Sequence, residues 1–173
     1  MNYATLKTHD VANGVGIRVS LFVSGCTHHC KGCFNAEAWD FDYGAPYTAE
    51  VEERILRALE PSYVRGLSLL GGEPFEIQNQ PDLLTLLKRV KQRFPSKSVW
   101  CYSGYTLEDD ILSGRLGEAA LQMLRYVDVL VDGEFIEAKK DLSLRFRGSS
   151  NQRIIDIPST LASGEVVICS NFT

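Results

Sequence analysis

The sequence of 173 residues lacks any apolar stretch long enough to cross a bilayer, so no transmembrane helix is expected. It also lacks a surplus of positive charge. Its 18 Lys and Arg stand against 22 Asp and Glu, and this net charge of −4 argues against a protein that wraps nucleic acid through phosphate contacts. Residues 1–10 hold no apolar signal segment. We therefore expect a cytoplasmic protein with no membrane and no nucleic-acid partner.

Cysteine is scarce, and the five that are present form an odd number. Three of them, Cys26, Cys30 and Cys33, follow directly after the apolar run at residues 19–23. A disulfide is not expected in a chain of cytosolic composition. A short loop can aim three thiolates at one point, which suits a soft metal or an iron–sulfur cluster. Three ligands leave one coordination position open, and an open position usually binds or reacts with something.

A structural zinc site is the alternative for the same residues. His28 or His29 would complete a Cys₃His tetrahedron with the three cysteines. Zinc sites, however, usually pair one Cys-x2-Cys with a second pair well separated in sequence, and this chain has no second pair. The redox cluster is therefore favoured, and both histidines are interpreted as solvated loop residues. A second motif, Gly-Gly-Glu-Pro at 71–74, also ends an apolar run, and the two motifs together indicate an enzyme.

Short apolar runs predict buried strands at residues 19–23, 67–70, 99–102 and 127–131, with weaker candidates at 153–157 and 165–169. Amphipathic patterns between these runs predict helices. Thr48 is the expected N-cap of the first helix, and Pro81 fits the first turn of the second. Thr106 and Asp109 resemble a capping box before a third, which two later glycines are expected to break. This alternating order favours an α/β fold with a mainly parallel sheet.

The length of the chain favours a single domain over residues 1–173, with a core of about 10–153 and a C-terminal extension of about 154–173. A complete eight-fold barrel needs about 250 residues, so we expect an incomplete, laterally open (β/α)6-type barrel. Active sites in barrels gather at the C-terminal ends of the strands. The cysteine loop and the polar motifs at 71–73, 103–104 and 132–133 all follow predicted strands. They are therefore expected to converge on one mouth.

The cysteine loop together with Gly-Gly-Glu-Pro at 71–74 resembles the radical S-adenosylmethionine (radical SAM) superfamily. Within it, the sequence is similar to the activating proteins of anaerobic ribonucleotide reductases. Six blocks carry the similarity: NGVGIR at 13–18, LFVSGC at 21–26, CKGCFN at 30–35, SGY at 103–105, DVLVDGEF at 128–135 and RGSSNQ at 147–152. The last two blocks are the more family-specific ones. Gly32 stands where the superfamily usually has an aromatic residue, and the aromatic follows as Phe34, which is itself a habit of these activators. Val15 replaces a common proline.

The resemblance implies a radical SAM barrel in which Cys26, Cys30 and Cys33 hold a [4Fe–4S] cluster as thiolates. The fourth iron would chelate the methionine part of S-adenosylmethionine. One electron then cleaves a carbon–sulfur bond, and a 5′-deoxyadenosyl radical takes hydrogen from a glycine Cα in the large subunit of the anaerobic ribonucleotide reductase. A one-electron donor such as flavodoxin or ferredoxin is the other implied partner. Activation of another glycyl radical enzyme, such as pyruvate formate-lyase, is the alternative, against which the 147–152 block argues.

Six residues are expected to contact S-adenosylmethionine: Gly32, Cys33, Phe34, Gly71, Gly72 and Glu73. Without Cβ atoms, Gly71 and Gly72 let the backbone approach the ligand and bond to its ammonium group. Glu73 either adds a favourable charge or caps the segment that follows it. Gly32 and Phe34 are expected on the adenosine side of the pocket. No catalytic residue is expected beyond the cluster and the cofactor.

The remaining polar and sulfur-bearing residues have weaker signals. Arg145, Arg147 and Arg153 either grip a partner or the S-adenosylmethionine carboxylate, or are solvated charges. Cys101 alternates within an apolar strand, so it is expected to be a small buried residue. Cys169 and the C-terminal extension have no predicted role.

Overall fold

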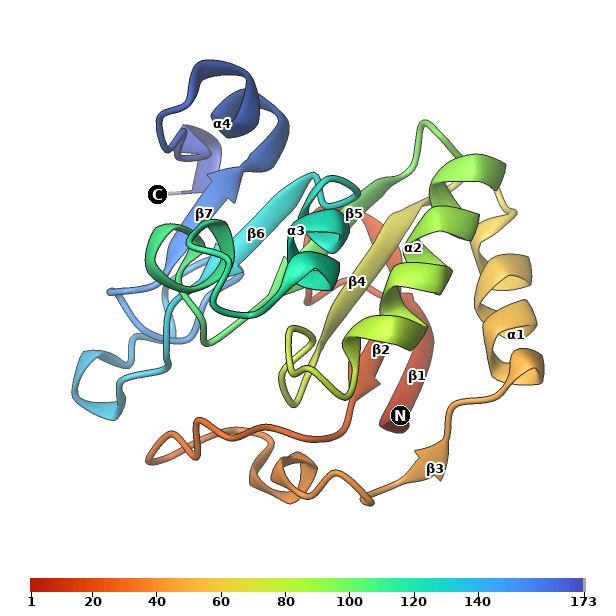
Figure 1. Ribbon diagram of the computed structural model, residues 1–173, viewed down its shortest axis with the longest axis horizontal. Coiled ribbons are helices and arrows are strands. Elements are labelled where there is room, and N and C mark those ends of the chain that lie inside the picture. The colour runs from red at the N-terminus through yellow and green to blue at the C-terminus, as the bar shows by residue number, and fades with distance from the viewer. Residues whose placement is uncertain (173) are drawn as a thin grey trace.

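The structure is a computed structural model that describes residues 1–172, organised around one seven-stranded sheet (Figure 1). The strand order is β3-β1-β2-β4-β5-β6-β7. The strands are β1 (Asn2–Asp10), β2 (Ile17–Val23), β3 (Ala45–Pro46), β4 (Val64–Gly71), β5 (Ser98–Tyr102), β6 (Val129–Asp132) and β7 (Arg153–Asp156). Strands β2, β4, β5 and β6 run parallel, whereas β1, β3 and β7 pair antiparallel with their neighbours. The fold is therefore an open α/β sheet with a parallel centre.

The four strands predicted with most apolar character are confirmed, and they form the parallel centre. The weaker candidate at 153–157 is confirmed as β7. The strand predicted at 165–169 is wrong, because this segment makes only an isolated bridge between Ile155 and Ile168 and a few backbone bonds along the edge of β7. Strand β1 is not apparent from the sequence, because its exposed positions carry Thr5, Lys7 and His9 and few of its residues are apolar.

Three helices, α1 (Ala49–Leu59), α2 (Gln80–Arg93) and α3 (Glu118–Leu124), lie on one face of the sheet, and α4 (Ile157–Ser163) follows β7 (Figure 1). The hydroxyl oxygen of Thr48 accepts the N–H of Val51 at 3.4 Å, which confirms the predicted N-cap. Pro81 lies in the first turn of α2, also as predicted. Within the described residues, short 3₁₀ segments occur at η1 (Ala36–Trp39), η3 (Glu137–Lys139) and η4 (Ser170–Phe172).

The capping box predicted at Thr106 and Asp109 is wrong by one residue. Residues Leu107–Leu112 form a π-helical turn, η2, in which the N–H of Ile111 donates to the carbonyl of Thr106. Because a π turn is wider than an α turn, Asp110 is the residue that reaches back. Its carboxylate accepts from the N–H of Thr106 at 2.7 Å and from the hydroxyl of Thr106 at 3.0 Å. Helix α3 then begins separately.

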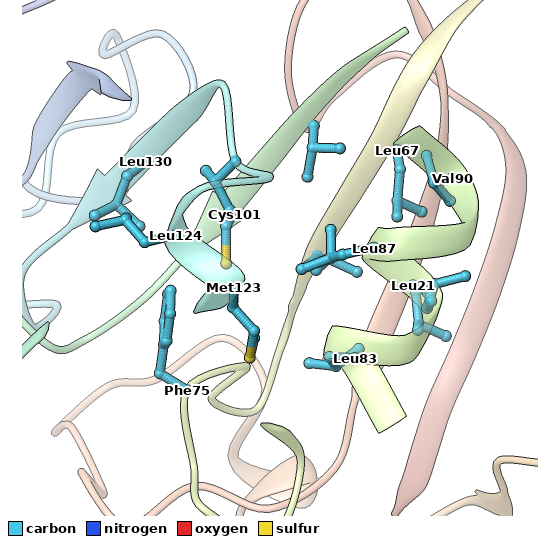
Figure 2. Close-up of a cluster of buried hydrophobic side chains, with 14 of the residues drawn as sticks. Leu21, Leu67, Phe75, Leu83, Leu87, Val90, Cys101, Met123, Leu124 and Leu130 are labelled. Carbon is cyan, nitrogen blue, oxygen red and sulfur yellow. The ribbon is translucent and has the colours of Figure 1, made fainter. Parts of the chain in front are cut away.

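The main hydrophobic core fills the space between the sheet and the helices (Figure 2). Strands contribute Leu21, Leu67, Leu69, Cys101 and Leu130, and the helices close over them with Leu83, Leu87, Val90, Met123 and Leu124. The helical spacing in α2 is confirmed as a core-facing stripe. Cys101 is fully buried in this core, as predicted. Among residues 1–172, we find no helix with the length and apolar character that crossing a bilayer requires.

The opposite face of the sheet is free of these helices. Successive side chains of a strand point to opposite faces, so Phe22, Leu70 and Tyr102, each one position beyond a core residue, point away from the helices. Near the carboxyl ends of the strands these three side chains line a pocket. The sheet therefore separates a helix-covered core from a face that carries the pocket.

Candidate functional site

The pocket has a volume of about 470 Å³, within the range of about 300–1,000 Å³ typical of small-molecule sites. It is lined by the three loop cysteines and by residues that follow three other parallel strands. These include Gly71 at the end of β4 with Gly72 and Glu73 after it, Ser103 and Gly104 after β5, and Gly133 after β6. The predicted convergence of four motifs on one mouth is therefore confirmed.

The cysteine loop leaves β2 and packs back on the η1 segment. The N–H of Gly25 donates to the carbonyl of Ala38 at 2.8 Å, and the N–H of Cys26 donates to that of Trp39 at 3.1 Å. Cys26 is buried, Cys30 and Cys33 are half-buried, and all are free thiols. Burial raises the pKa of the Cys26 thiol to about 12. Metal binding at this residue must therefore displace a proton.

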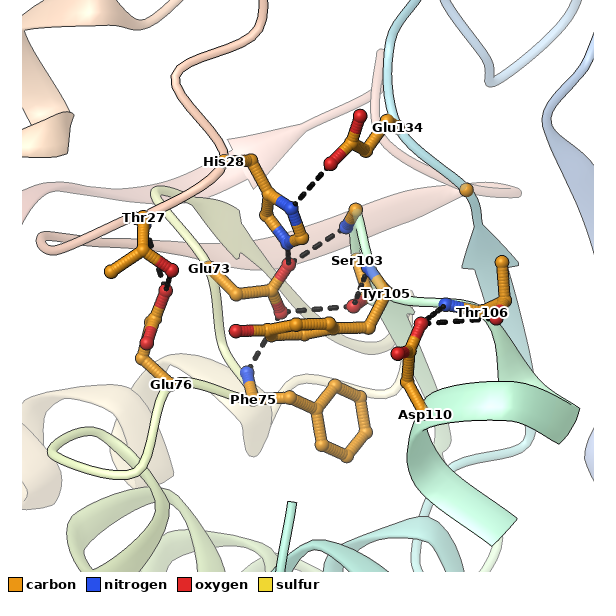
Figure 3. A network of polar contacts seen from close by, with 12 residues as sticks. Thr27, His28, Glu73, Phe75, Glu76, Ser103, Tyr105, Thr106, Asp110 and Glu134 are labelled. Carbon is orange, nitrogen blue, oxygen red and sulfur yellow. Dashed lines mark hydrogen bonds and ion pairs between the residues drawn. The ribbon is translucent and has the colours of Figure 1, made fainter. Parts of the chain in front are cut away.

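His28 is not the solvated loop residue that the sequence suggests, and that prediction is wrong. Its side chain is only 9% exposed and lies between two carboxylates (Figure 3). Its Nε2 is 3.2 Å from Glu73 Oε2, and its Nδ1 is 2.9 Å from Glu134 Oε1. Burial lowers the pKa of His28, but hydrogen bonds and attraction from Glu73 and Glu134 outweigh burial and raise this pKa to about 9. His29, in contrast, is exposed and stacks on Trp39.

Glu73 is only 1% exposed, and its carboxylate is surrounded by donors from three segments. Oε1 accepts from the N–H of Phe75 at 2.8 Å and from the hydroxyl of Ser103 at 2.9 Å. Oε2 accepts from the N–H of Gly104 at 2.7 Å and faces His28. These contacts correspond to the second of its two predicted roles, because Glu73 caps the turn that follows β4. It also ties that turn to the end of β5 and to the cysteine loop.

Gly71 and Gly72 lie where two backbones meet. The N–H of Gly72 donates to the carbonyl of Val23 at 2.7 Å. A Cβ on Gly72 would lie 2.5 Å from the carbonyl oxygen of Gly25 and 2.9 Å from that of Ala38. Gly71 has a φ of +109°, which glycine adopts readily. The absence of side chains here therefore lets the end of β4 pack against the cysteine loop, a requirement that the sequence alone does not reveal.

Comparison with known proteins points to the family that the cysteine loop and the glycine turn resemble in sequence. The family model described as a 4Fe-4S single cluster domain matches residues 12–155. The chain is 44% identical to the anaerobic ribonucleoside-triphosphate reductase-activating protein of Vibrio cholerae over 156 residues, which cover 89% of this chain and 97% of the relative. It is 42% identical to the protein of the same name from Escherichia coli K12 over 154 residues, or 88% of this chain and 96% of the relative. The phage T4 protein of that name is 40% identical over 156 residues, or 89% and 93% of the two chains.

The chain belongs to this family of reductase-activating proteins. The match to the 4Fe-4S domain supports an iron–sulfur cluster as its cofactor. Within residues 1–172, no three Cys, His, Asp or Glu side chains lie close enough together to hold a single metal ion. A [4Fe–4S] cluster makes a different demand, because each thiolate binds a different iron and the sulfur atoms stay apart. Three free thiols around one pocket fit that demand.

The zinc alternative fits this member of the family less well. His28, the buried candidate for a fourth zinc ligand, has both ring nitrogens within hydrogen-bonding distance of carboxylates. His29 is exposed against Trp39. A zinc ion would need its ligands at about 2.0–2.3 Å from one point. Neither histidine is placed to join the three cysteines in that way.

Phe34 and Gly32, both predicted to contact S-adenosylmethionine, lie in different surroundings. Phe34 lines the pocket and is nevertheless 62% exposed, with its ring 5.3 Å from that of Phe135. Gly32 does not line the pocket, and a Cβ there would lie 2.8 Å from Glu137 Oε1. Its φ of +72° explains why glycine occupies this position, because the turn before Cys33 requires a left-handed backbone conformation there.

Polar atoms without partners are a feature of the pocket that the sequence signals poorly. Trp39 Nε1, Tyr102 Oη and Arg147 Nε are buried and have no hydrogen-bond partner in the described part of the chain, and all three residues line the pocket. Trp39 and Tyr102 resemble ordinary core aromatics in sequence. Arg147 is held by a bond from its guanidinium to the carbonyl of Gln152 at 2.8 Å. Unpaired buried groups are rare, so these atoms suit a pocket that a polar ligand completes.

Arg153 and Arg145 do not line the pocket. Arg153 donates to Glu108 Oε2 at 2.6 Å and to Asp132 Oδ1 at 2.9 Å, and a further contact joins it to Asp132 Oδ2. Asp132 is 1% exposed and also accepts the N–H of Leu107. Arg153 thus fastens β6, β7 and η2 together. Arg145 is exposed and lies over the ring of Phe146.

Proposed function

We propose that this chain activates the large subunit of an anaerobic ribonucleotide reductase by placing a glycyl radical on it. The observation that carries the proposal is the convergence of Cys26, Cys30 and Cys33 with the turn after β4 on one pocket. The family membership supports the choice of partner. A one-electron donor such as flavodoxin or ferredoxin would be the second partner.

In this proposal the three cysteines each bind one iron of a [4Fe–4S] cluster, and the fourth iron is left for S-adenosylmethionine. A reduced cluster held by these cysteines would supply the one electron needed to cleave bound S-adenosylmethionine to methionine, and the 5′-deoxyadenosyl group would leave as 5′-deoxyadenosine after taking one hydrogen atom from the glycine Cα. The protein supplies binding, orientation and exclusion of water.

The pocket residues have separate tasks in this proposal. Of the six residues expected to contact S-adenosylmethionine, five line the pocket: Cys33, Phe34, Gly71, Gly72 and Glu73. The turn at 71–72 would offer backbone carbonyls to the ammonium group of the ligand. Arg147 lines the same pocket with an unpaired Nε and is suited to the carboxylate. Phe34, half in the pocket and half in solvent, would form one wall at its mouth.

We further infer that the sheet, with its four parallel strands at the centre, is an incomplete, laterally open variant of the (β/α)6-type radical SAM barrel within a single domain. The helices cover one face of the sheet, and the pocket lies on the other face at the carboxyl ends of the strands. This is the arrangement of outer helices and inner site that barrel enzymes use. An open side would admit a loop of the reductase that carries the glycine.

The experiment that tests the function is anaerobic reconstitution with iron and sulfide, followed by reduction in the presence of S-adenosylmethionine and the reductase large subunit. We expect about four irons per chain and a doublet glycyl signal by electron paramagnetic resonance that depends on this protein. A signal obtained only with pyruvate formate-lyase would assign the chain to the alternative activase. A colourless protein that retains zinc and cleaves no S-adenosylmethionine would leave the zinc-stabilised binding module.

A further inference from the structure

Two of the three residues between Cys26 and Cys30 are anchored by side chains from outside the loop (Figure 3). Thr27 donates its N–H at 2.8 Å and its hydroxyl at 2.6 Å to the same oxygen of Glu76, which is buried after β4. His28, the next residue, lies between Glu73 and Glu134. Consecutive residues of the cysteine loop are therefore tied to the ends of two different strands.

The ring of His28 fits closely between the residues that surround it. A Cβ on Gly104 would lie 2.6 Å from Cδ2 and 2.7 Å from Nε2 of His28, so only a glycine after β5 leaves room for the imidazole. The ring of Tyr105 meets it edge-on, with centroids 4.4 Å apart. Glu73 follows β4, Gly104 and Tyr105 follow β5, and Glu134 follows β6. His28 thus contacts the ends of all three strands that face the cysteine loop across the pocket.

We propose that His28 is a positioning residue that fixes the cysteine loop against the turn after β4, and so sets where a bound cluster lies relative to S-adenosylmethionine. This inference rests on the proposed function. Glu73 is bonded to His28 and directly follows Gly72, at the turn assigned to the ligand, while His28 itself lies between two cysteines assigned to the cluster. One side chain therefore joins the two halves of the site. Groups that orient metal ligands commonly change metal affinity or activity by about 10-fold to 100-fold when removed.

The test compares His28→Ala and His28→Gln with His29→Asn. The control changes the neighbouring histidine, whose φ of +49° asparagine tolerates and whose ring contacts neither carboxylate. Each reconstituted protein is analysed for iron. The reduced cluster is then titrated with S-adenosylmethionine, and the change in its electron paramagnetic resonance spectrum is followed. Neither readout requires the reductase.

We expect His28→Ala to keep about four irons per chain but to need about tenfold more S-adenosylmethionine for half-saturation of the spectral change. His28→Gln keeps a donor and should recover part of this loss, and His29→Asn should match the wild type. A titration of His28→Ala that superimposes on the wild type would overturn the proposal. Loss of iron from both His28 variants would also overturn it, because His28 would then be a ligand or a residue needed for folding.

A second variant tests the link through Glu134. Glu134→Ala alone should raise the half-saturating concentration of S-adenosylmethionine several-fold. It should add nothing in the His28→Ala background, because both changes break the same contact between His28 and Glu134. Effects that simply multiply would show that the two residues act separately and would contradict the proposal. If the wild type shows the spectral change but yields no glycyl radical on the reductase, the proposed function fails while the role of His28 stands.

Discussion

Gly72 and Gly25 approach so closely that a Cβ on Gly72 would lie 2.5 Å from the carbonyl oxygen of Gly25, the residue before Cys26. The turn after β4 also bonds to this loop directly, because the N–H of Glu73 donates to the same carbonyl at 2.8 Å. The two motifs recognised in the sequence are therefore one packed unit. A substitution in the glycine turn should therefore displace the cysteine loop.

This contact predicts the effect of Gly72→Ala. The added methyl group should push the cysteine loop away from β4, lower the free energy of unfolding by about 1–3 kcal/mol and reduce the iron content after reconstitution. Gly114→Ala is the control for the close contact, because a Cβ at Gly114 meets nothing within 4 Å. Its φ of +80°, unlike the backbone at Gly72, adds a strain of its own, so the control is expected to lose some stability but to keep the wild-type iron content. Denaturant unfolding and iron analysis measure the two effects. Normal iron content in Gly72→Ala would show that the glycine serves the ligand alone.

Substitution of the cysteines should have two different effects on the cluster, depending on their place in the fold. Cys26→Ala, Cys30→Ala and Cys33→Ala should each lose the cluster and with it the cleavage of S-adenosylmethionine. Cys101→Ala should keep both and lose only about 1 kcal/mol of stability, because this side chain is a buried part of the core. Production of 5′-deoxyadenosine measures cleavage. Iron retention with full cleavage in any of the first three variants would contradict the ligand assignment.

Glu73→Gln tests the buried carboxylate in the absence of any cofactor. A glutamine offers one acceptor oxygen and a donor group where Glu73 presents two acceptors to Phe75, Ser103, Gly104 and His28. We expect the free energy of unfolding of the apoprotein to fall by about 2–4 kcal/mol. The exposed residue Glu165, changed to Gln, should stay within about 0.5 kcal/mol of the wild type. Equal urea midpoints for the two variants would refute the structural role of Glu73.

Arg153→Ala should destabilise the end of the sheet by about 3–5 kcal/mol at neutral pH, because it leaves the buried carboxylate of Asp132 without its cation. The hydrogen bond from Arg153 holds the pKa of Glu108 below its ordinary value of 4.5. Such a carboxyl adds stability above its unfolded pKa, and this stability is lost as the pH falls through the folded pKa. The difference between wild type and variant, measured by urea unfolding, should therefore shrink below about pH 4. A difference that grows on acidification would be inconsistent with this ion pair.

Much of the parallel centre is predictable because its strands are short apolar runs, and the spacing of the cysteines marks the metal loop without a structure. The role of His28 is not predictable in this way. Its partner Glu134 lies 106 residues away, and the space for its ring depends on the missing side chain of Gly104. A local pattern carries no information on such contacts. Strand β1 is missed for a different reason, since its residues are stabilised by pairing with β2 rather than by their own apolar character.

The most direct measurement of the central claim is the transfer of hydrogen itself. The reductase large subunit is prepared with glycine that carries deuterium at Cα and is mixed with the reduced protein and S-adenosylmethionine. We predict that 5′-deoxyadenosine gains one deuterium as the glycyl signal appears, and that a Cys30→Ala preparation yields neither. A glycyl radical that forms while 5′-deoxyadenosine stays free of deuterium would contradict direct abstraction from glycine at this site.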